Sequence, residues 1–402
     1  MTVLLQRLAI GINIFWLLWC SNLIAKSSVE PVTINLTFTH ENQQLKQLLQ
    51  EFAVNEDFAL TITWMDQAKL KSQLMTSSKS QIPDALICPA DNLGLSGYVS
   101  YSKIPQSLID ESFDANSLAT VTLNKEIFGV PLVDGNHLLL FYNRRLVKTP
   151  ASTWSELLAQ NESLPKNISL IGWSFMEMYW FTPFITAFGE PPLIKNLPHL
   201  NTPAMQQALQ FVWQLNNTNI VDGGCDYECV ERRFINGELA YTINGIWAYK
   251  NFSDRLKKDL GVMRLPAIQG NRMRPYHSTI ALTFPNDSLF GPKQKALQAL
   301  LKMVQQERFQ QRLWQDLNDI PARPDVAAAI RAKVTPNQAV LFDALETSVP
   351  MPSHKNMSIV WEAMLQGYTR YGNGEFSAQQ ASAYMQKIAE KAISPISHLE
   401  SP

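Results

Sequence analysis

The chain has 402 residues, which is too long for one hydrophobic core and predicts two domains or three. Its formal net charge of −1 excludes the basic field with which proteins recruit nucleic acid or anionic lipid. Ten tryptophans are many for one chain, and because exposed rings are costly we expect some of them to line a cleft.

Residues 1–25 have the pattern of an export signal. Arg7 supplies a positive charge, and the apolar stretch "LAIGINIFWLLWC" follows it, interrupted once by Asn13. Small or neutral residues come next, with Ala25 as the expected last residue of the leader. The alternative is an uncleaved membrane anchor, because residues 8–25 are just long enough to span a bilayer. We favour a cleaved signal peptide, since polar residues weaken that span.

After the leader, apolar patterns of strand and helix type alternate along the chain. This alternation is the βαβ signature of a parallel sheet, in which ligands bind beyond the carboxyl ends of the strands. The stretches His40–Asn42 and Pro89–Asn92 are therefore the first places to look for a site. The elements expected here are strands over 31–40, 58–65 and 83–90 and helices over 42–56 and 67–77.

Further along, Asp134–Asn136 interrupts two strand-like stretches, and we expect the chain to cross between domains there. Trp247 and Tyr249 directly follow "YTING", which reads as a strand stopped by a turn. The other elements expected are a helix over 204–217, a helix and a strand over 226–245, two strands over 260–270 and 276–285 that cross back, and helices from 293 onward.

Two cysteines, Cys225 and Cys229, form a candidate disulfide if the protein is exported. The loop between them would be short, so we expect the bond to pin a loop onto the start of a helix. A zinc site is disfavoured because no histidine lies near them. Cys88 is expected to be a small buried residue.

The sequence contains no recognisable metal-binding set, phosphate-cradling glycine loop or nucleophile elbow, so we expect no cofactor and no metal. An enzyme would have to rely on carboxylates, chiefly Glu41, Asp91, Glu177 and Glu362. Isolated acids on helices and loops are far more often solvated than catalytic. The residues therefore favour a binding protein over an enzyme.

Three aromatic residues, Tyr179, Trp247 and Trp361, each follow a loop and have polar neighbours. Flat apolar rings beside hydrogen-bonding groups suit a ligand with one apolar and one polar aspect, as sugar rings have. For each ring alone, packing in the core is an equal alternative. The tryptophans expected in the core are Trp173, Trp180, Trp213 and Trp314.

Several stretches resemble the periplasmic maltose/maltodextrin-binding proteins of bacterial ABC importers, within the family-1 extracellular solute-binding proteins. The most specific is "FINGELAYTINGIWAY", and the supporting ones include "EMYWFTPFITAFG", "IPARPDV" and "MPSHKNMSIVWEAM". The similarity runs from about Pro31 to about Ile393.

This resemblance implies an α/β, two-lobed periplasmic-binding-protein fold, with a mainly parallel sheet flanked by helices in each lobe. Several chain crossings would form a hinge, near 134–136, near Pro266 and near 325–334, on which the lobes close around a ligand. The implied boundaries are 29–134 with 267–328 for lobe 1, and 135–266 with 329–397 for lobe 2.

Residue by residue, the family's aromatic sugar platforms match Tyr179, Trp247 and Trp361, and two of its acids match Asp91 and Glu177. Glu41 replaces the acid of the first strand. The departures place Asn42 at a lysine, Cys88 at a tryptophan, Asn92 at an arginine, Asn136 at the hinge-side glutamate, and Glu362 and Leu365 at a tyrosine and an arginine. The predicted ligand-binding set is Glu41, Asn42, Asp91, Asn92, Asn136, Glu177, Tyr179, Trp247, Trp361 and Glu362.

The resemblance further implies a monomeric periplasmic receptor that binds a carbohydrate of the maltose or maltodextrin kind and delivers it to a membrane ABC permease. One alternative keeps the fold but binds another solute or signals to a membrane sensor, because several polar groups that discriminate between ligands are changed. A second alternative is a secreted hydrolase, which predicts turnover of maltodextrins.

Overall fold

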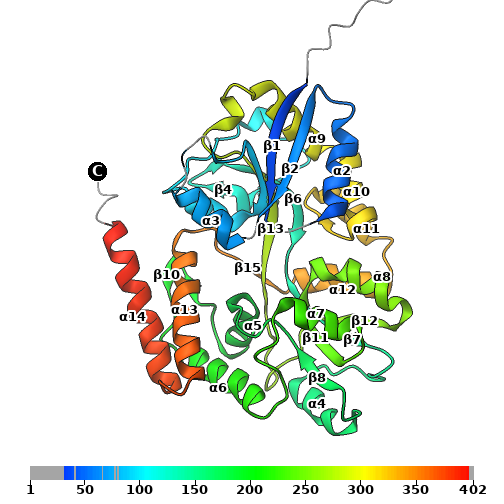
Figure 1. The fold of residues 1–402 in the computed structure, drawn as a ribbon, viewed down its shortest axis with the longest axis vertical. Coiled ribbons are helices and arrows are strands. Elements are labelled where there is room, and N and C mark those ends of the chain that lie inside the picture. Colours follow the sequence, from blue (N-terminus) through cyan, green and yellow to red (C-terminus); the bar gives the residue numbers. More distant parts are fainter. Residues whose placement is uncertain (1–30, 40–41, 66, 77, 79–80, 398–402) are drawn as a thin grey trace, which may run out of the picture.

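The computed structural model describes residues 31–397 except 40, 41, 66, 77, 79 and 80. The predicted leader and Glu41 lie outside the described residues. Figure 1 shows two bodies stacked along the long axis, with the last two helices, α13 (Asn356–Gly372) and α14 (Ala378–Ser397), side by side along the lower one. We call the upper body lobe 1 and the lower body lobe 2.

Lobe 1 is built on a sheet with the strand order β14-β6-β13-β3-β1-β2, to which β15 adds by pairing with β13. A short hairpin, β4 (Thr122–Leu123) with β5 (Glu126–Ile127), lies beside it. The strands of the sheet are β1 (Val32–Phe38), β2 (Phe58–Trp64), β3 (Ala85–Pro89), β6 (Gly129–Gly135), β13 (Tyr276–Thr283), β14 (Ile320–Pro321) and β15 (Val349–Pro350). The helices are α2 (Gln43–Ala53), α3 (Gln67–Thr76), α9 (Gln294–Gln305), α10 (Glu307–Arg312) and α11 (Pro324–Arg331).

Local sequence explains the start of lobe 1. Every residue of β3, "ALICP", is buried, as expected of a strand covered on both faces. Asn42 begins α2 as its N-cap, accepting a hydrogen bond from the backbone N–H of Leu45 at 2.9 Å. The apolar face of α2 then packs into the core through Leu45, Leu48, Leu49 and Ala53.

Lobe 2 is built on a sheet with the order β12-β7-β11-β8. Its strands are β7 (Leu138–Asn143), β8 (Ser169–Gly172), β11 (Leu239–Gly245) and β12 (Leu260–Met263), and a separate pair is β9 (Leu193–Ile194) with β10 (Leu197–Pro198). The helices that precede α13 are α4 (Trp154–Ala159), α5 (Met178–Phe188), α6 (Pro203–Asn217), α7 (Tyr227–Ile235), α8 (Tyr249–Leu256) and α12 (Pro336–Leu345).

Both faces of the lobe 2 sheet are covered. In β7, Leu138 and Leu140 join the apolar cluster that contains α4, α5, α6, α13 and α14, whereas Leu139 and Phe141 join the cluster of α7, α8 and α12. Because side chains alternate between faces along a strand, burial on both sides requires the uninterrupted apolar run seen in "LLLF".

Strand directions refine the prediction of mainly parallel sheets. In lobe 1, β1, β2, β3 and β6 run one way, and in lobe 2, β8, β11 and β12 do. The reversed strand inside each sheet, β13 or β7, is the first strand after the chain arrives from the other lobe. Each such strand enters its sheet from the hinge side. Strand β7 pairs antiparallel with β11 and β12, and β13 pairs antiparallel with β3 and β6 but parallel with the short β15, so the hydrogen-bonded ladders are mixed rather than mainly parallel.

The chain passes between the lobes at several places. The first crossing joins β6 to β7 through Asn136 and His137, and the second joins β12 to β13 through residues 264–275. The third leaves β14 for α12, which packs on β12, and then returns to β15 beside Tyr276 and His277. The predicted residue boundaries of the lobes stay a prediction. Among the described residues, no helix combines the length and apolarity that a membrane span requires.

Candidate ligand-binding cleft

Two cavities lie between the lobes. The first has a volume of about 880 Å³ and brings together Asp91 of lobe 1 with Glu177, Tyr179, Trp247, Trp361 and Glu362 of lobe 2. The second has a volume of about 660 Å³ and is lined by Thr39 and Asn42 of lobe 1 and by Ser174, Tyr227 and Glu231 of lobe 2. Asn136, Glu177, Trp180 and Trp247 line both cavities and so form the partition between them.

The three predicted aromatic residues meet on one wall of the first cavity. The ring centroid of Tyr179 is 6.4 Å from that of Trp247 and 6.4 Å from that of Trp361, at interplanar angles of 49° and 55°. Each ring is half-buried, so it packs on lobe 2 and still presents surface to the cavity. Core packing and a position in the cleft are therefore not exclusive alternatives for these residues, because each ring packs against the core cluster and also lines the first cavity.

Trp247 is held in place by its neighbours. It lies in a short 3-10 helix, η7 (Ile246–Ala248), directly after β11, and its indole Nε1 donates to the hydroxyl of Tyr227 at 3.0 Å. A Cβ on Gly245 would lie 2.0 Å from the indole ring, so only glycine leaves room for the ring to fold back over the end of the strand.

Tyr179 connects the aromatic wall to the hinge. It lies in the first turn of α5, and its hydroxyl is within hydrogen-bonding distance of two backbone carbonyl oxygens, that of Asn136 and, at 3.0 Å, that of Tyr276. The first carbonyl belongs to the β6–β7 crossing and the second to the start of β13, where the second crossing ends. Burial raises the pKa of Tyr179, so the hydroxyl stays protonated and serves as a donor.

The predicted acids occupy different positions around the first cavity. Asp91 lies in a 3-10 helix, η3 (Ala90–Leu95), directly beyond the carboxyl end of β3, as predicted for a ligand site of an α/β sheet. Glu177 is the exposed residue that precedes α5. Glu362 is exposed on α13 and accepts a hydrogen bond from Gln366 at 2.8 Å. These oxygens could accept hydrogen bonds from a ligand's hydroxyl groups.

The predicted asparagines divide into two groups. Asn136 and Asn42 line the cleft, although the side chain of Asn42 also caps α2. Asn92 does not line either cavity: it is 1% exposed and donates to the backbone carbonyl of Pro89 at 2.9 Å. Cys88 is buried as predicted, and burial, reinforced by the nearby Asp91, raises the pKa of its thiol to about 12.

Sequence reasoning missed several cleft residues. Trp180 was expected in the core, and although it is buried with its indole N–H on the carbonyl of Ile243 at 2.9 Å, it also lines both cavities. The outer end of the first cavity is apolar and exposed, formed by Met75, Tyr98 and Met176 together with Leu365, the residue that the resemblance places at a family arginine. The second cavity includes Glu231 and Asp319, and burial raises the pKa of Glu231 and raises that of Asp319 to about 7.

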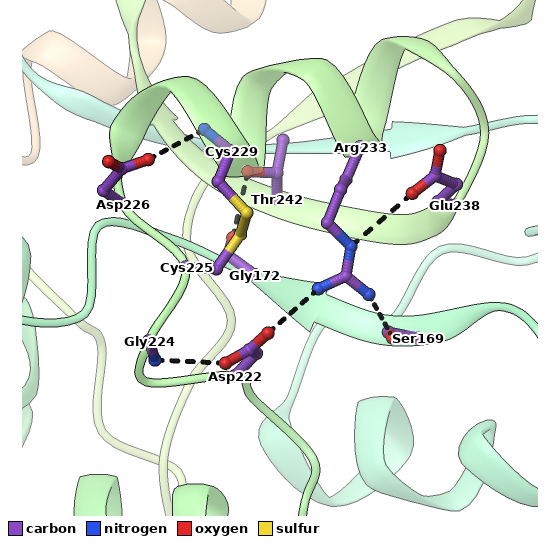
Figure 2. Close-up of a disulfide and its surroundings, with 10 residues drawn as sticks. All are labelled: Ser169, Gly172, Asp222, Gly224, Cys225, Asp226, Cys229, Arg233, Glu238 and Thr242. Carbon is purple, nitrogen blue, oxygen red and sulfur yellow. Dashed lines mark hydrogen bonds and ion pairs between the residues drawn. A yellow bond between two sulfur atoms is a disulfide. The ribbon is translucent and has the colours of Figure 1, made fainter.

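The candidate disulfide is formed, at the start of the helix that carries Tyr227 and Glu231 of the second cavity. Cys225 is bonded to Cys229 in the first turn of α7, where Asp226 caps the helix by accepting from the N–H of Cys229 at 2.9 Å (Figure 2). The bond therefore pins a loop onto a helix start, as predicted. Further along α7, the guanidinium of Arg233 reaches Asp222 at 3.4 Å, Ser169 at 2.7 Å and Glu238 at 3.8 Å (Figure 2). Together these contacts fix the helix that carries Tyr227 and Glu231.

No group of three or more His, Cys, Asp or Glu side chains within the described residues could hold a metal ion. The cleft offers flat aromatic faces on one wall and carboxylate and amide oxygens around it. This arrangement suits non-covalent binding of a ligand that has both apolar faces and hydrogen-bond donors.

Two named proteins are similar to this chain over most of its length. The maltodextrin-binding protein MdxE of Bacillus subtilis (strain 168) is 21% identical over 352 residues, which cover 82% of this chain and 82% of that protein. A maltooligosaccharide ABC transporter solute-binding lipoprotein of Streptococcus pneumoniae serotype 4 (strain ATCC BAA-334 / TIGR4) is 21% identical over 313 residues, covering 72% of this chain and 71% of that protein.

Among solved structures, the maltose/maltodextrin-binding domain MalE from Bdellovibrio bacteriovorus bound to maltotriose matches with a TM-score of 0.83 and 23% identity. The match covers 90% of this chain and 100% of that one, so the two share a fold, and the predicted α/β two-lobed fold is confirmed. Residues 47–340 match the family described as bacterial extracellular solute-binding protein. Because that match extends over most of both lobes, the chain belongs to the bacterial extracellular solute-binding proteins.

Proposed function

We propose that this protein captures an oligosaccharide of the maltodextrin kind outside the cytoplasm and delivers it to an ABC importer. The observation that carries the proposal is the wall formed by Tyr179, Trp247 and Trp361, which faces Asp91 of the other lobe across the first cavity. Relatives that carry maltodextrin or maltooligosaccharide in their names support the ligand class.

In this proposal the sugar rings stack on the three aromatic side chains, and the oxygens of Asp91, Asn136, Glu177 and Glu362 accept hydrogen bonds from its hydroxyl groups. The unit of lobe 1 (29–134 and 267–328) closes on that of lobe 2 (135–266 and 329–397) by bending at the crossings. The closed monomer then presents the surface that the permease recognises. Small-angle X-ray scattering tests closure, with a smaller radius of gyration expected when ligand saturates the protein.

Binding is proposed to be non-enzymatic, and the protein is proposed to be periplasmic after removal of residues 1–25. Incubation with maltodextrins should therefore release no shorter sugars, and any turnover would favour a secreted hydrolase. Mass spectrometry of the exported protein should find Lys26 as its first residue.

The second candidate function is a receptor of the same fold for another solute, or one that signals to a membrane sensor. The specific observation in favour of another solute is that Leu365 extends the first cavity with an apolar side chain. A gene neighbourhood that encodes a sensor kinase instead of permease subunits would favour this candidate.

A thermal-shift screen of the mature protein against a sugar library tests the carbohydrate ligand. A ligand that binds only the folded state raises the melting temperature, and at about 100 times its Kd it adds about 2.7 kcal/mol of stability. Trp247→Ala should weaken binding of the best sugar by about 1–3 kcal/mol in titration calorimetry, because a large ring is lost from the wall. If no carbohydrate shifts the melting temperature, the proposal fails.

A further inference from the structure

Among the described residues, the ionisable side chains that line the two cavities, tyrosines aside, are all carboxylates. Asp91, Glu177 and Glu362 line the first cavity, and Glu177, Glu231 and Asp319 line the second. No lysine, arginine or histidine among the described residues lines either one. The chain as a whole carries 34 basic and 35 acidic residues, so this segregation is a property of the cleft and not of the composition.

The second cavity also contains aromatic rings, which a patch of surface acids lacks. Trp180, Tyr227 and Trp247 line it together with its carboxylates, and such a combination of ring faces and carboxylates recognises cations. Ser174 also lines this cavity, is 4% exposed, and its hydroxyl has no hydrogen-bond partner in the described part of the chain. A buried polar group without a partner is costly, which points to a ligand that supplies one.

The two acids specific to the second cavity come from opposite lobes. Glu231 lies on α7 of lobe 2, where the neutral side chain of Asn251 is its hydrogen-bond partner. Asp319 lies directly before β14 of lobe 1, and within the described residues its carboxylate accepts no hydrogen bond and has no ion pair. Burial raises the pKa of both carboxyl groups, and within the described residues no positive charge lies close enough to offset this rise.

Closure of the lobes would bring these two acids toward one another with less water between them. Without a positive charge, closure adds repulsion and desolvation, whereas an ammonium group between the acids relieves both. A neutral hydroxyl can donate to a carboxylate, but it leaves the charge in place.

We propose that the preferred ligand is an oligosaccharide that carries a positively charged amine, and that the second cavity holds this amine between Glu231 and Asp319. The sugar rings would occupy the aromatic wall of the first cavity, so the inference rests on the proposed function. It narrows the ligand class from neutral sugars to amino sugars.

Titration calorimetry with matched trisaccharides tests the inference at neutral pH. The probes are maltotriose, 6-amino-6-deoxymaltotriose with the amine on each ring in turn, and the N-acetylated forms of those amines, which keep the nitrogen and remove the charge. We expect the best amine to bind at least about tenfold more tightly than maltotriose and than its own N-acetylated form at low salt. The preference should shrink at about 0.5 M salt because the interaction is ionic.

Two variants test the placement of the amine. Glu231→Gln and Asp319→Asn should each reduce the amine-over-maltotriose ratio at least about threefold, since each removes one charge next to the ammonium. Glu190→Gln is the control, because Glu190 is an exposed acid of lobe 2 that lies outside both cavities. Melting curves of the free variants show that each one is folded.

The outcomes separate the inference from the proposed function. If maltotriose binds as tightly as every amine, the inference fails and the carbohydrate function stands. If the amine is preferred but neither variant lowers the ratio, the placement in the second cavity is wrong. If maltotriose does not bind and another neutral sugar does, the same comparison is made with that sugar and its amine. If no carbohydrate binds, the proposed function itself fails.

Discussion

Gly245 shows how one residue without a side chain prepares the aromatic wall. The indole of Trp247 lies over it so closely that any Cβ would overlap the ring. On the other side of the ring system, Tyr227 accepts the indole N–H, so both the position and the tilt of Trp247 are fixed before a ligand arrives. Preorganisation of this kind lowers the entropy lost on binding.

Gly245→Ala should therefore displace the indole. We expect sugar affinity to fall about tenfold, and the free energy of unfolding to fall by about 1–3 kcal/mol, because the added methyl group overpacks the site. Titration calorimetry and urea unfolding measure the two effects. Gly97→Ala is the control, since a Cβ at Gly97 meets nothing within 4 Å and should change neither quantity. Equal affinity of the Gly245→Ala variant and the parent would contradict this account of the Trp247 position.

At the scale of elements, α5 is the link between the ligand wall and the hinge. Its first turn carries Tyr179, whose ring faces the first cavity and whose hydroxyl bonds backbone carbonyls of two different crossings. In the proposed function, a ligand that contacts this ring therefore contacts a residue bonded to the segments that are expected to bend. Tyr179 would then serve both ligand binding and lobe closure.

Tyr179→Phe separates these roles, because it keeps the ring and removes the hydroxyl. We expect the free energy of unfolding to fall by about 1–3 kcal/mol, since two crossing carbonyls lose their buried donor. Sugar affinity should fall much less in this variant than in Tyr179→Ala, which also loses the ring. Tyr384→Phe is the control: its hydroxyl bonds Gln366 at an exposed position, and we expect a change within about 0.5 kcal/mol. The proposed hinge role is wrong if both Phe variants are equally stable in urea unfolding.

The helices and strands were predictable where the pattern of apolar residues that specifies them is local in the sequence. The expected strands over 31–40 and 83–90 correspond to β1 and β3, and the aromatic residues expected at element ends do meet in a cavity. Asn92 differs from expectation because η3 begins at Ala90 and turns its side chain back onto Pro89. Periodicity carries no signal for such a tight turn.

At the scale of the whole molecule, the second cavity could not be predicted from the sequence. Its walls come from segments as distant as Thr39, Glu231 and Asp319, which only the crossings bring together. Neither Glu231 nor Asp319 belongs to a recognisable motif, since each is an acid on an ordinary helix or loop. Their proposed role rests on their position in the second cavity between the two lobes, which is a property of the tertiary structure.

Two groups near the boundary between the lobes, His137 and Asp319, make opposing contributions to the pH dependence of stability. His137, fully buried in the β6–β7 crossing, has its pKa lowered to about 3, mainly by burial and then by nearby His277. Since its unfolded pKa is about 6.5, the unfolded state binds the extra proton between these values, and the stability due to His137 is lost as pH falls below about 6.5. Asp319 acts with the opposite sign: its pKa of about 7 lies above its unfolded value, so its stability is full below about pH 4 and is lost as pH rises through about 7.

Between about pH 4 and 6.5 the two contributions cancel, because His137 gains one proton on unfolding while Asp319 loses one. We therefore expect each single variant to show a change of unfolding free energy with pH that is cancelled in the parent protein. Relative to the parent, Asp319→Asn should gain about 3 kcal/mol of unfolding free energy as pH rises across this window, at about 1.4 kcal/mol per pH unit. His137→Leu should show the opposite dependence and gain about the same amount of unfolding free energy as pH falls.

Urea unfolding of the three proteins at several pH values measures these differences, and the contributions of the other titrating groups cancel because they are common to all three. Parallel stability–pH curves for parent and variants would mean that neither group is held away from its ordinary pKa by the fold.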